Sequence, residues 1–335
     1  MAPTAHSALV LQGGGALGAY ELGAARALFR DGNFKPDLIA GVSIGAITAV
    51  LLARPKKGAP LAALEQFWKE VTVRGWFLPP DLRPYASFLG NPHFFTPRND
   101  YYGWASWKYF YETTPLRRTL EDLVDVDALA KTDAVPRLLV TATNLNAGQI
   151  DPFDSQDQSL TLDHIMASCS LPPAFPMTVI GKNSYWDGGL FDNTPLGAVL
   201  DRMVQASGTE RTIYVVNLFP NEAPIPGNLL EIMARMKNLQ FANKTAEDLK
   251  LICRFNQVAR LMKALEELPG GNPLKDNKAY TDMVDRGYIN VPHIVPITNP
   301  DPISEFSDAD FSREAIEKRA DEGYAQTMKA LEAKT

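Results

Sequence analysis

Residues 41–45, Gly-Val-Ser-Ile-Gly, place Ser43 between two glycines, Gly41 and Gly45. The short apolar run Leu38–Ala40 precedes this motif, and a segment rich in alanine and leucine follows it. This context predicts a sharp strand-to-helix turn, in which side chains at 41 or 45 would collide with the helix or the neighbouring strand. Such a turn exposes the serine hydroxyl at a helix N-terminus, where the dipole favours developing negative charge. Ser43 is therefore the candidate nucleophile.

A glycine-rich loop follows the apolar run 8–12 and comprises Gly13, Gly14, Gly15 and Gly18. Successive glycines before a helix allow several backbone N–H groups to point into one concavity. The spacing matches G-x-G-x-x-G, so a phosphate or dinucleotide site is one interpretation, and an oxyanion hole for acyl transfer is another. A dinucleotide site expects an acidic residue at the end of the second strand, but Asp37 precedes that strand. The second strand is followed instead by the candidate nucleophile Ser43, which favours the oxyanion hole. A purely structural role of the glycine turn stays open as a third interpretation.

Asp187 comes at the end of a predicted strand and is followed by Gly188 and Gly189. An aspartate on such a turn is a candidate general base for Ser43, a metal ligand or an ordinary turn residue. Considered alone, this motif does not separate the three interpretations.

The three motifs, GGGALG at 13–18, GVSIG at 41–45 and DGG at 187–189, resemble those of the patatin-like phospholipase family in type and order. The segment 167–176 and the residues Asn193 and Pro195 also fit, so the resemblance covers roughly residues 8–205. It implies a three-layer α/β/α fold with a mostly parallel central sheet. It also implies a Ser–Asp dyad without a catalytic histidine, no metal and no cofactor.

Transferred by position, the resemblance makes Ser43 the nucleophile and Asp187 the base. The N–H groups of Gly14 and Gly15, helped by Gly13, would form the oxyanion hole. Five further glycines would support the motifs: Gly18, Gly41, Gly45, Gly188 and Gly189. A serine cannot ionise alone, so the carboxylate must lie within hydrogen-bond reach, with a pKa raised by burial. Many family members carry Arg or Lys inside the glycine loop, where this chain has Leu17.

The four histidines are His6, His93, His164 and His293. The order Ser43, Asp187, His293 is that of an α/β-hydrolase triad, so this alternative needs a test. In α/β-hydrolases the strand-to-helix turn that carries the nucleophile, called the elbow, usually follows several strands. The corresponding turn at Ser43 follows only two. His293 also lies in an apolar strand, where a structural histidine is more common.

The chain alternates strands and helices through its first 50 residues, which predicts an α/β fold with a parallel sheet. We expect a catalytic domain at 8–205 and, at 206–335, a C-terminal strand and helical extension packed on the same core. Within the first, residues 76–111 hold thirteen of the 32 aromatic residues and five prolines. We expect this segment to form an aromatic lid or acyl-chain channel, or an insertion packed on the core.

Further elements are predicted from apolar runs and from 3.6-residue spacing. They are helices at 16–30, 46–53, 61–73, 162–168, 195–206, 228–266 and 312–333, a helix and loop at 115–129, and strands at 137–143, 212–219 and 293–297. We expect strand 212–219 to be central in the sheet.

Composition narrows the function classes. The net charge of −6 argues against a general affinity for nucleic acid. Two cysteines, Cys169 and Cys253, are too few and too far apart for a disulfide framework or a zinc site. No segment approaches the ~20 apolar residues that span a bilayer, and the N-terminus lacks the pattern of a signal peptide. We therefore expect a cytoplasmic protein whose membrane contact, if any, is peripheral; the oligomeric state stays open.

The leading functional prediction is a serine acyl-ester hydrolase of lipids, of phospholipase A, lysophospholipase or carboxylesterase type. A second enzymatic alternative is a hydrolase of another hydrophobic acyl ester or thioester, including a stored polyester. The non-enzymatic alternative is a lipid-binding scaffold that keeps the fold without turnover.

Overall fold

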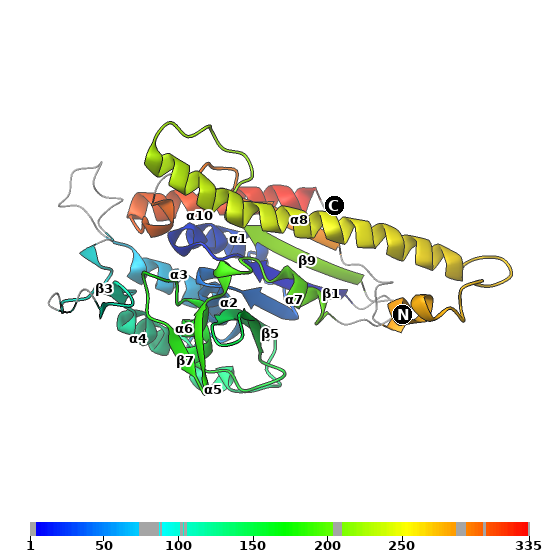
Figure 1. Ribbon diagram of the computed structural model, residues 1–335, viewed down its shortest axis with the longest axis horizontal. Coiled ribbons are helices and arrows are strands. Elements are labelled where there is room, and N and C mark those ends of the chain that lie inside the picture. The colour runs from blue at the N-terminus through cyan, green and yellow to red at the C-terminus, as the bar shows by residue number, and fades with distance from the viewer. Residues whose placement is uncertain are drawn as a thin grey trace.

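The computed structural model describes residues 5–73, 87, 89–100, 103, 106–203, 210–285, 293–303 and 306–333, which form three layers (Figure 1). The middle layer is a sheet of eight strands within these residues. Each strand is hydrogen-bonded to the next along the path β10 (His293–Thr298), β9 (Glu210–Asn217), β1 (Ala5–Leu11), β2 (Leu38–Gly41), β5 (Arg137–Asn144), β8 (Asn183–Asp187) and β7 (Thr178–Ile180), and β6 (Gln149–Asp154) also pairs with β5. The first five are parallel, and β6, β7 and β8 join antiparallel. The predicted mostly parallel sheet is confirmed.

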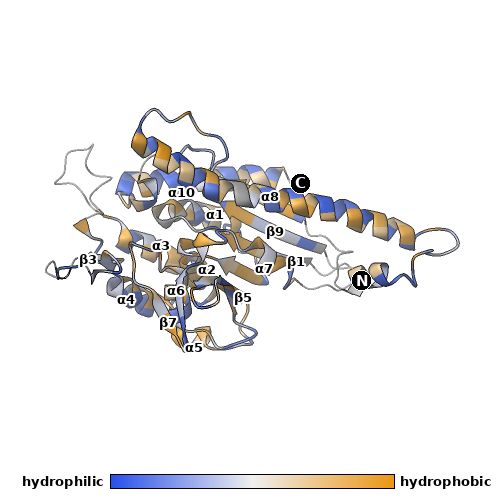
Figure 2. Cartoon of the chain, in the orientation of Figure 1, coloured by the Kyte–Doolittle hydropathy of each residue, from blue (hydrophilic) through white to orange (hydrophobic). Residues whose placement is uncertain are grey.

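Alternate side chains of the central strands enter two different cores, because successive residues of a strand point to opposite faces. In β1, Leu9 and Leu11 pack in the larger core, against α1 (Ala19–Leu28), α2 (Ile44–Ala53), α3 (Pro60–Val71) and α10 (Arg313–Glu332). Ala8 and Val10 pack on the opposite face, against α7 (Leu196–Leu200) and α8 (Leu229–Glu266). The interior is apolar on both faces of the sheet (Figure 2). The expected α/β/α layering is therefore confirmed.

The remaining described elements flank these layers. They are η1 (Gly15–Gly18), β3 (Thr96–Pro97), β4 (Tyr111–Glu112), α4 (Thr114–Leu123), α5 (Val126–Leu129), α6 (Leu162–Ser168), η4 (Gly188–Leu190), α9 (Lys278–Asp285) and η5 (Ser307–Ala309).

The predicted elements differ from the structure in a few places. Strand 212–219 is not central, because only β10 lies beyond β9 at that side of the sheet. The predicted helix 16–30 is a 3-10 turn followed by α1, and the helix expected at 195–206 already ends at Leu200. The strands β6 and β7 and the helix α9 are absent from the prediction, because each is short, at six, three and eight residues.

The aromatic segment 76–111 lies partly outside the described residues, since 74–86, 88, 101–102 and 104–105 are not described. In the described part, Phe94 and Phe95 are buried in the larger core beside Phe311. These two residues pack on the core, and the role of the segment as a lid, a channel or a packed insertion stays a prediction.

The C-terminal part of the chain completes the same sheet and core. It supplies β9 and β10, and α10 approaches α1 so closely that glycines are required at the contact. A Cβ atom at Gly23 would lie 1.8 Å from the Ala320 carbonyl oxygen, and one at Gly323 would lie 2.0 Å from that of Tyr20. Among the described helices, none combines the length and apolar character that crossing a membrane requires.

Candidate active site

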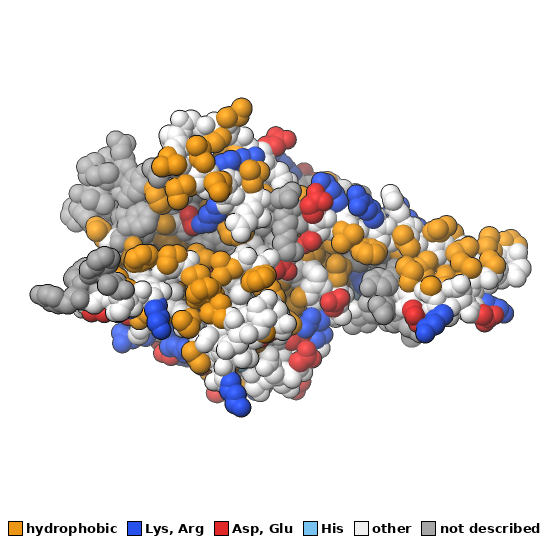
Figure 3. Space-filling view, viewed as in Figure 1, with side chains coloured by type: hydrophobic (Ala, Val, Ile, Leu, Met, Phe, Trp, Pro, Cys, Tyr) orange, Lys and Arg blue, Asp and Glu red, His pale blue; other side chains and the backbone are white. Residues whose placement is uncertain are grey.

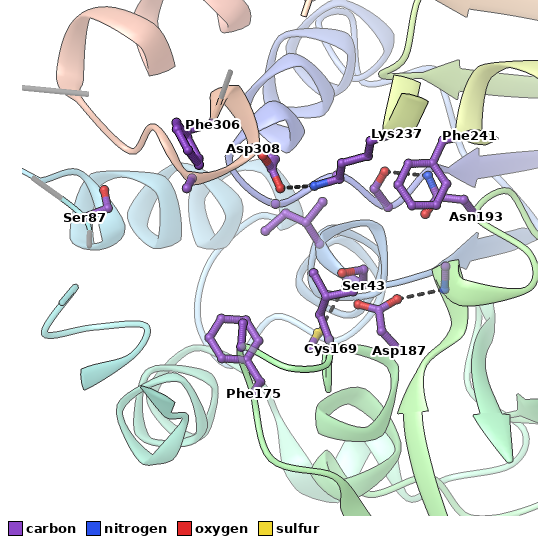
Figure 4. Close-up of a pocket in the computed structure, with 18 of the residues that line it drawn as sticks. Ser43, Ser87, Cys169, Phe175, Asp187, Asn193, Lys237, Phe241, Phe306 and Asp308 are labelled. Carbon is purple, nitrogen blue, oxygen red and sulfur yellow. Dashed lines mark hydrogen bonds and ion pairs between the residues drawn. The ribbon is translucent and has the colours of Figure 1, made fainter. Parts of the chain in front are cut away.

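Ser43 and Asp187 meet because two strands share one edge of β5. β6 occupies the other edge along most of its length, so β2 and β8 pair on the same side. Gly41, at the end of β2, lies opposite Val140, and Asp187, at the end of β8, lies opposite Ala142. Since β8 runs antiparallel to β5, its last residue points back toward the end of β2. The serine of the elbow and the aspartate therefore lie side by side (Figure 4).

Ser43 occupies a backbone conformation that side-chain-bearing residues rarely adopt. Its φ is 56° and its ψ is −124°, immediately before α2 begins at Ile44. Its N–H donates to the Ser168 hydroxyl at 2.9 Å, and its carbonyl accepts from the Cys169 thiol at 3.3 Å. Strained residues of this kind persist where the surroundings hold them, and they gather at functional sites. Ser168 and Cys169 are the side chains that hold this turn from α6 and its C-terminus.

The glycines of the elbow are required by close backbone approaches, as the sequence predicts. A Cβ at Gly41 would lie 2.1 Å from the Gly45 carbonyl oxygen. A Cβ at Gly45 would lie 2.4 Å from the carbonyl oxygen of Leu11, at the end of the neighbouring strand β1. These distances are too short for any side chain, so both positions exclude alanine without a shift of the backbone.

Asp187 is 2% exposed, and burial raises its pKa to about 6. Its Oδ1 accepts the Gly189 N–H at 2.8 Å. Its Oδ2 has no hydrogen-bond partner among the described residues. The Ser43 hydroxyl, the Gly189 N–H and the charge of Lys237 oppose the rise of the pKa. A carboxylate with a free oxygen and a pKa near neutrality has the properties of a general base.

The turn after Asp187 is bound directly to the glycine loop. The Gly13 N–H donates to the Asn193 carbonyl at 3.2 Å, and the Asn193 side-chain amide donates to the Gly13 carbonyl at 2.9 Å. A Cβ at Gly188 would lie 2.6 Å from the Thr141 carbonyl oxygen, and one at Gly189 would lie 2.6 Å from Asn193 Oδ1. Both glycines therefore permit the turn to close against its neighbours.

The glycine loop offers two N–H groups rather than three. The Gly13 N–H is already bonded to Asn193, so it is not available to a ligand, which corrects the expectation of a contribution from Gly13. In the part of the chain that the structure describes, the N–H groups of Gly14 and Gly15 have no hydrogen-bond partner. Gly15 has a φ of +57°, and Gly18 packs against Ile44, so the loop curves toward the elbow. Gly14 and Gly15 line the same cavity as Ser43, which is the arrangement that an oxyanion hole requires.

A cavity of about 530 Å³ opens above Ser43 and Asp187. Its walls are mainly apolar, include several aromatic residues, and come from segments far apart in the chain. Six of these aromatic residues are Phe94, Phe95, Phe175, Phe219, Phe241 and Phe311. An apolar cavity of this size with a few convergent polar groups is typical of a site for a small hydrophobic ligand.

The cation of the cavity comes from α8. Leu17, at the position where the family often has a basic residue, is buried in the larger core. Lys237 is the basic residue that lines the described cavity, and it forms an ion pair with Asp308 of η5 (Figure 4). Neither residue is predicted from the sequence, because a lysine within a long helix and an aspartate in a short turn carry no motif. Asn193, in contrast, follows the DGG motif closely in the chain.

No histidine lines the described cavity. His293 begins β10, which runs parallel to β1 and β2 in the same sheet. Because β1 and β2 end at the site, the first residue of β10 lies at the opposite end of the strands. His164 caps α6, where its Nδ1 accepts the Thr161 N–H at 2.9 Å. His6 lies near the start of β1 beside Asp37, and His93 lies beside Glu70. The triad with His293 is therefore not supported. Among the described residues, no cluster of His, Cys, Asp or Glu is suited to hold a metal ion.

Comparison with known proteins gives matches to two family models and to solved structures of low sequence identity. A family model described as patatin-like phospholipase matches residues 9–200, and one described as patatin phospholipase matches residues 239–335. No curated protein matches the chain. VipD from Legionella pneumophila is 16% identical, with a TM-score of 0.42, over 99% of this chain and 67% of that one. The ExoU–SpcU complex of the type III secretion system of Pseudomonas aeruginosa is 13% identical, with a TM-score of 0.34, over 99% of this chain and 52% of that one. This chain therefore spans about half the length of that protein.

Proposed function

Because the chain belongs to the patatin-like phospholipase family, we propose that it is a serine acyl-ester hydrolase of lipids with Ser43 as nucleophile and Asp187 as base. The observation that carries this proposal is the pairing of a strained elbow serine with a buried aspartate beneath an apolar cavity. An aspartate with a pKa of about 6 is ionised at neutral pH and still basic enough to accept a proton.

In the first half-reaction, Ser43 Oγ attacks the acyl carbonyl carbon while its proton passes to Asp187 Oδ2. The tetrahedral oxyanion accepts hydrogen bonds from the N–H groups of Gly14 and Gly15. Loss of one such donor typically costs about 3 kcal/mol of transition-state stabilisation. As the tetrahedral intermediate collapses, the leaving alcohol takes the proton from Asp187, and the acyl group stays on Ser43 as an ester.

In the second half-reaction, Asp187 accepts a proton from a water molecule that attacks the acyl-enzyme. The second tetrahedral intermediate uses the same two N–H donors. Its collapse releases the carboxylic acid, and Ser43 recovers its proton from Asp187. The dyad thus needs no imidazole. The carboxylate acts as a base when it takes the proton from Ser43 or water, and as an acid when it returns the proton to the leaving alcohol or to Ser43.

The aromatic cavity would hold the acyl chain. We assign the catalytic groups to a domain at 8–205, and we propose that the segment 206–335 closes the cavity. The support is that Lys237 and Phe241 of α8 and Phe311 near α10 line it. A hydrolase of another hydrophobic ester or thioester would use the same catalytic groups. The fit of the acyl chain in the cavity would then decide which of these substrates is hydrolysed.

A fluorophosphonate probe, which reacts covalently with activated serines, tests the proposal directly. Mass spectrometry should place the label on Ser43 in the wild-type protein, and Ser43→Ala should abolish it. Failure to label Ser43 in folded protein would favour the lipid-binding scaffold instead.

Turnover is then measured with p-nitrophenyl esters of increasing chain length, followed by phospholipid, lysophospholipid and acyl-thioester substrates. Ser43→Ala and Asp187→Asn should each lower kcat by at least about 10³-fold, as removal of dyad members does in other serine hydrolases. Asp163→Asn, which loses an ion pair with Arg117 on another surface, is the matched control and should keep wild-type turnover. Wild-type turnover in either dyad variant would contradict the mechanism.

A further inference from the structure

The first three turns of α8 expose a row of large apolar side chains. We call this set the α8 rim face, and it consists of Leu229, Ile232, Met233, Met236 and Leu239. Their spacing of three and four residues places them on one side of the helix. Leu229 is 71% exposed and Met236 is 67% exposed, and Figure 3 shows hydrophobic side chains gathered over this part of the molecule. A contiguous apolar row of this kind marks an interaction site.

The α8 rim face is continuous with the cavity above Ser43. Met233 belongs to the face and also lines the cavity, and Lys237 and Phe241 line it from the adjacent side of the same helix. Phe306, which is partly exposed, lines the cavity from the η5 segment. An apolar path therefore leads from the exposed face past Met233 to the catalytic serine.

The charged side chains of the same stretch have partners within the protein. Glu231 accepts from the Gly227 N–H and from Asn228 at the helix N-terminus. Arg235 donates to the Asn221 carbonyl, and Lys237 pairs with Asp308. The face consequently presents apolar side chains without an excess of either charge, which suits an apolar occupant better than an acidic or basic one.

We propose that the α8 rim face docks on a lipid surface and passes acyl chains from that surface past Met233 into the cavity. This inference rests on the proposed function, because a lipid substrate must leave its bilayer or droplet at the mouth of the cavity. A second copy of the chain on the same face would cover Met233, which is part of that mouth. An amphipathic helix of this type lies in the interface plane, with its apolar side immersed by about 5–10 Å.

The test measures binding and chemistry separately. Binding is measured by sedimentation with phosphatidylcholine vesicles, in the Ser43→Ala protein so that the vesicles stay intact. Leu229→Glu and Met236→Glu should each weaken binding by about tenfold or more, because each removes the burial of a large apolar side chain and places a charge against the lipid. Binding should change little between low and high salt, since apolar contact carries it.

Leu261→Glu is the matched control. Leu261 is 62% exposed on the same helix, and it lies 25 residues beyond Met236, which is about 38 Å along the axis. Binding of this variant should stay within about twofold of wild type, an effect of the size expected for a surface substitution. All three variants are then assayed in the Ser43 background on vesicles and on a soluble short-chain ester. The rim variants should lose activity on vesicles and keep it on the soluble ester.

The outcomes separate the two proposals. A protein that hydrolyses the soluble ester but does not bind vesicles overturns the docking surface and leaves the proposed function standing. A protein that binds vesicles through the α8 rim face but is not labelled at Ser43 overturns the proposed function and leaves the docking surface standing. Equal effects of Met236→Glu and Leu261→Glu, or a dimer in solution that Met236→Glu dissociates, would also overturn the docking surface.

Discussion

Asn193 binds Gly13 twice, through its carbonyl at 3.2 Å and through its side-chain amide at 2.9 Å, although 180 residues separate the two. The pair joins the turn after Asp187 to the loop that carries Gly14 and Gly15. The proposed base and the proposed oxyanion donors are therefore held in one rigid unit, while the aromatic walls of the cavity belong to other segments.

Asn193→Ala should lower kcat by about tenfold to a hundredfold, because displaced donors stabilise the oxyanion less well. KM should change little, since the aromatic walls stay in place. The measurement is steady-state hydrolysis of a soluble p-nitrophenyl ester. Asn183→Ala, on β8 outside the cavity, is the control and should behave as wild type. A rise of KM with unchanged kcat would assign Asn193 to substrate binding instead.

The pH dependence of activity should follow Asp187. Its pKa is raised to about 6, so the base form dominates above that pH and disappears below it. We expect kcat/KM for a neutral ester to be flat above about pH 7 and to fall tenfold per unit well below pH 6. A profile with its acid limb near pH 4 would show that Asp187 is not the base or is not buried in solution.

Lys237 should set the position of this acid limb. Its positive charge lowers the pKa of Asp187, so Lys237→Met should move the limb to higher pH. The double variant Lys237→Met, Asp308→Asn tests the same point without leaving Asp308 unpaired. Lys237→Arg keeps the charge and should leave the limb in place. A limb that does not move in either methionine variant would contradict the electrostatic role.

Asp187 should also make folding stability depend on pH. Its folded pKa of about 6 exceeds the ordinary value of 3.8, so the folded state favours the protonated form. This contribution is complete below pH 3.8 and is lost as the pH rises through 6, by about 3 kcal/mol in total. Asp187→Asn cannot ionise, so its stability relative to wild type should increase by about 2–3 kcal/mol between pH 4 and pH 7. Urea unfolding at several pH values measures the difference, and parallel curves for the two proteins would contradict the shift.

Gly15→Ala should be destabilising for two reasons that a second variant separates. The φ of +57° disfavours alanine, and the new Cβ would lie 2.3 Å from the Asp308 carbonyl oxygen. Gly32 has a φ of +66°, and a Cβ there would meet nothing within 4 Å, so Gly32→Ala reports the backbone penalty alone. We expect a loss of about 1 kcal/mol for Gly32→Ala and of about 2–4 kcal/mol for Gly15→Ala. Equal losses in urea unfolding would show that the η5 contact is not tight.

The parts of the site that could be predicted from the sequence are those whose geometry is local. Gly41 and Gly45 are needed because a Cβ at either position would lie 2.1–2.4 Å from a backbone oxygen, either four residues away or at the end of the adjacent strand. The long helix at 228–266 is likewise predictable almost to its ends, since its apolar residues follow a helical period. Asp187 could be singled out only with the help of the family's ordered motifs.

The sequence alone thus determined the elbow at Ser43, the glycine loop and the periodicity of the main elements, because each depends on residues within a turn or two. The tertiary structure decided which groups share the site. Pairing of β2 and β8 on one edge of β5 brings Asp187 to Ser43, and Asn193 removes Gly13 from the available donors. Lys237 reaches the cavity from α8. Such contacts depend on strand order and register, which bring together residues more than a hundred positions apart and leave no local pattern in the chain.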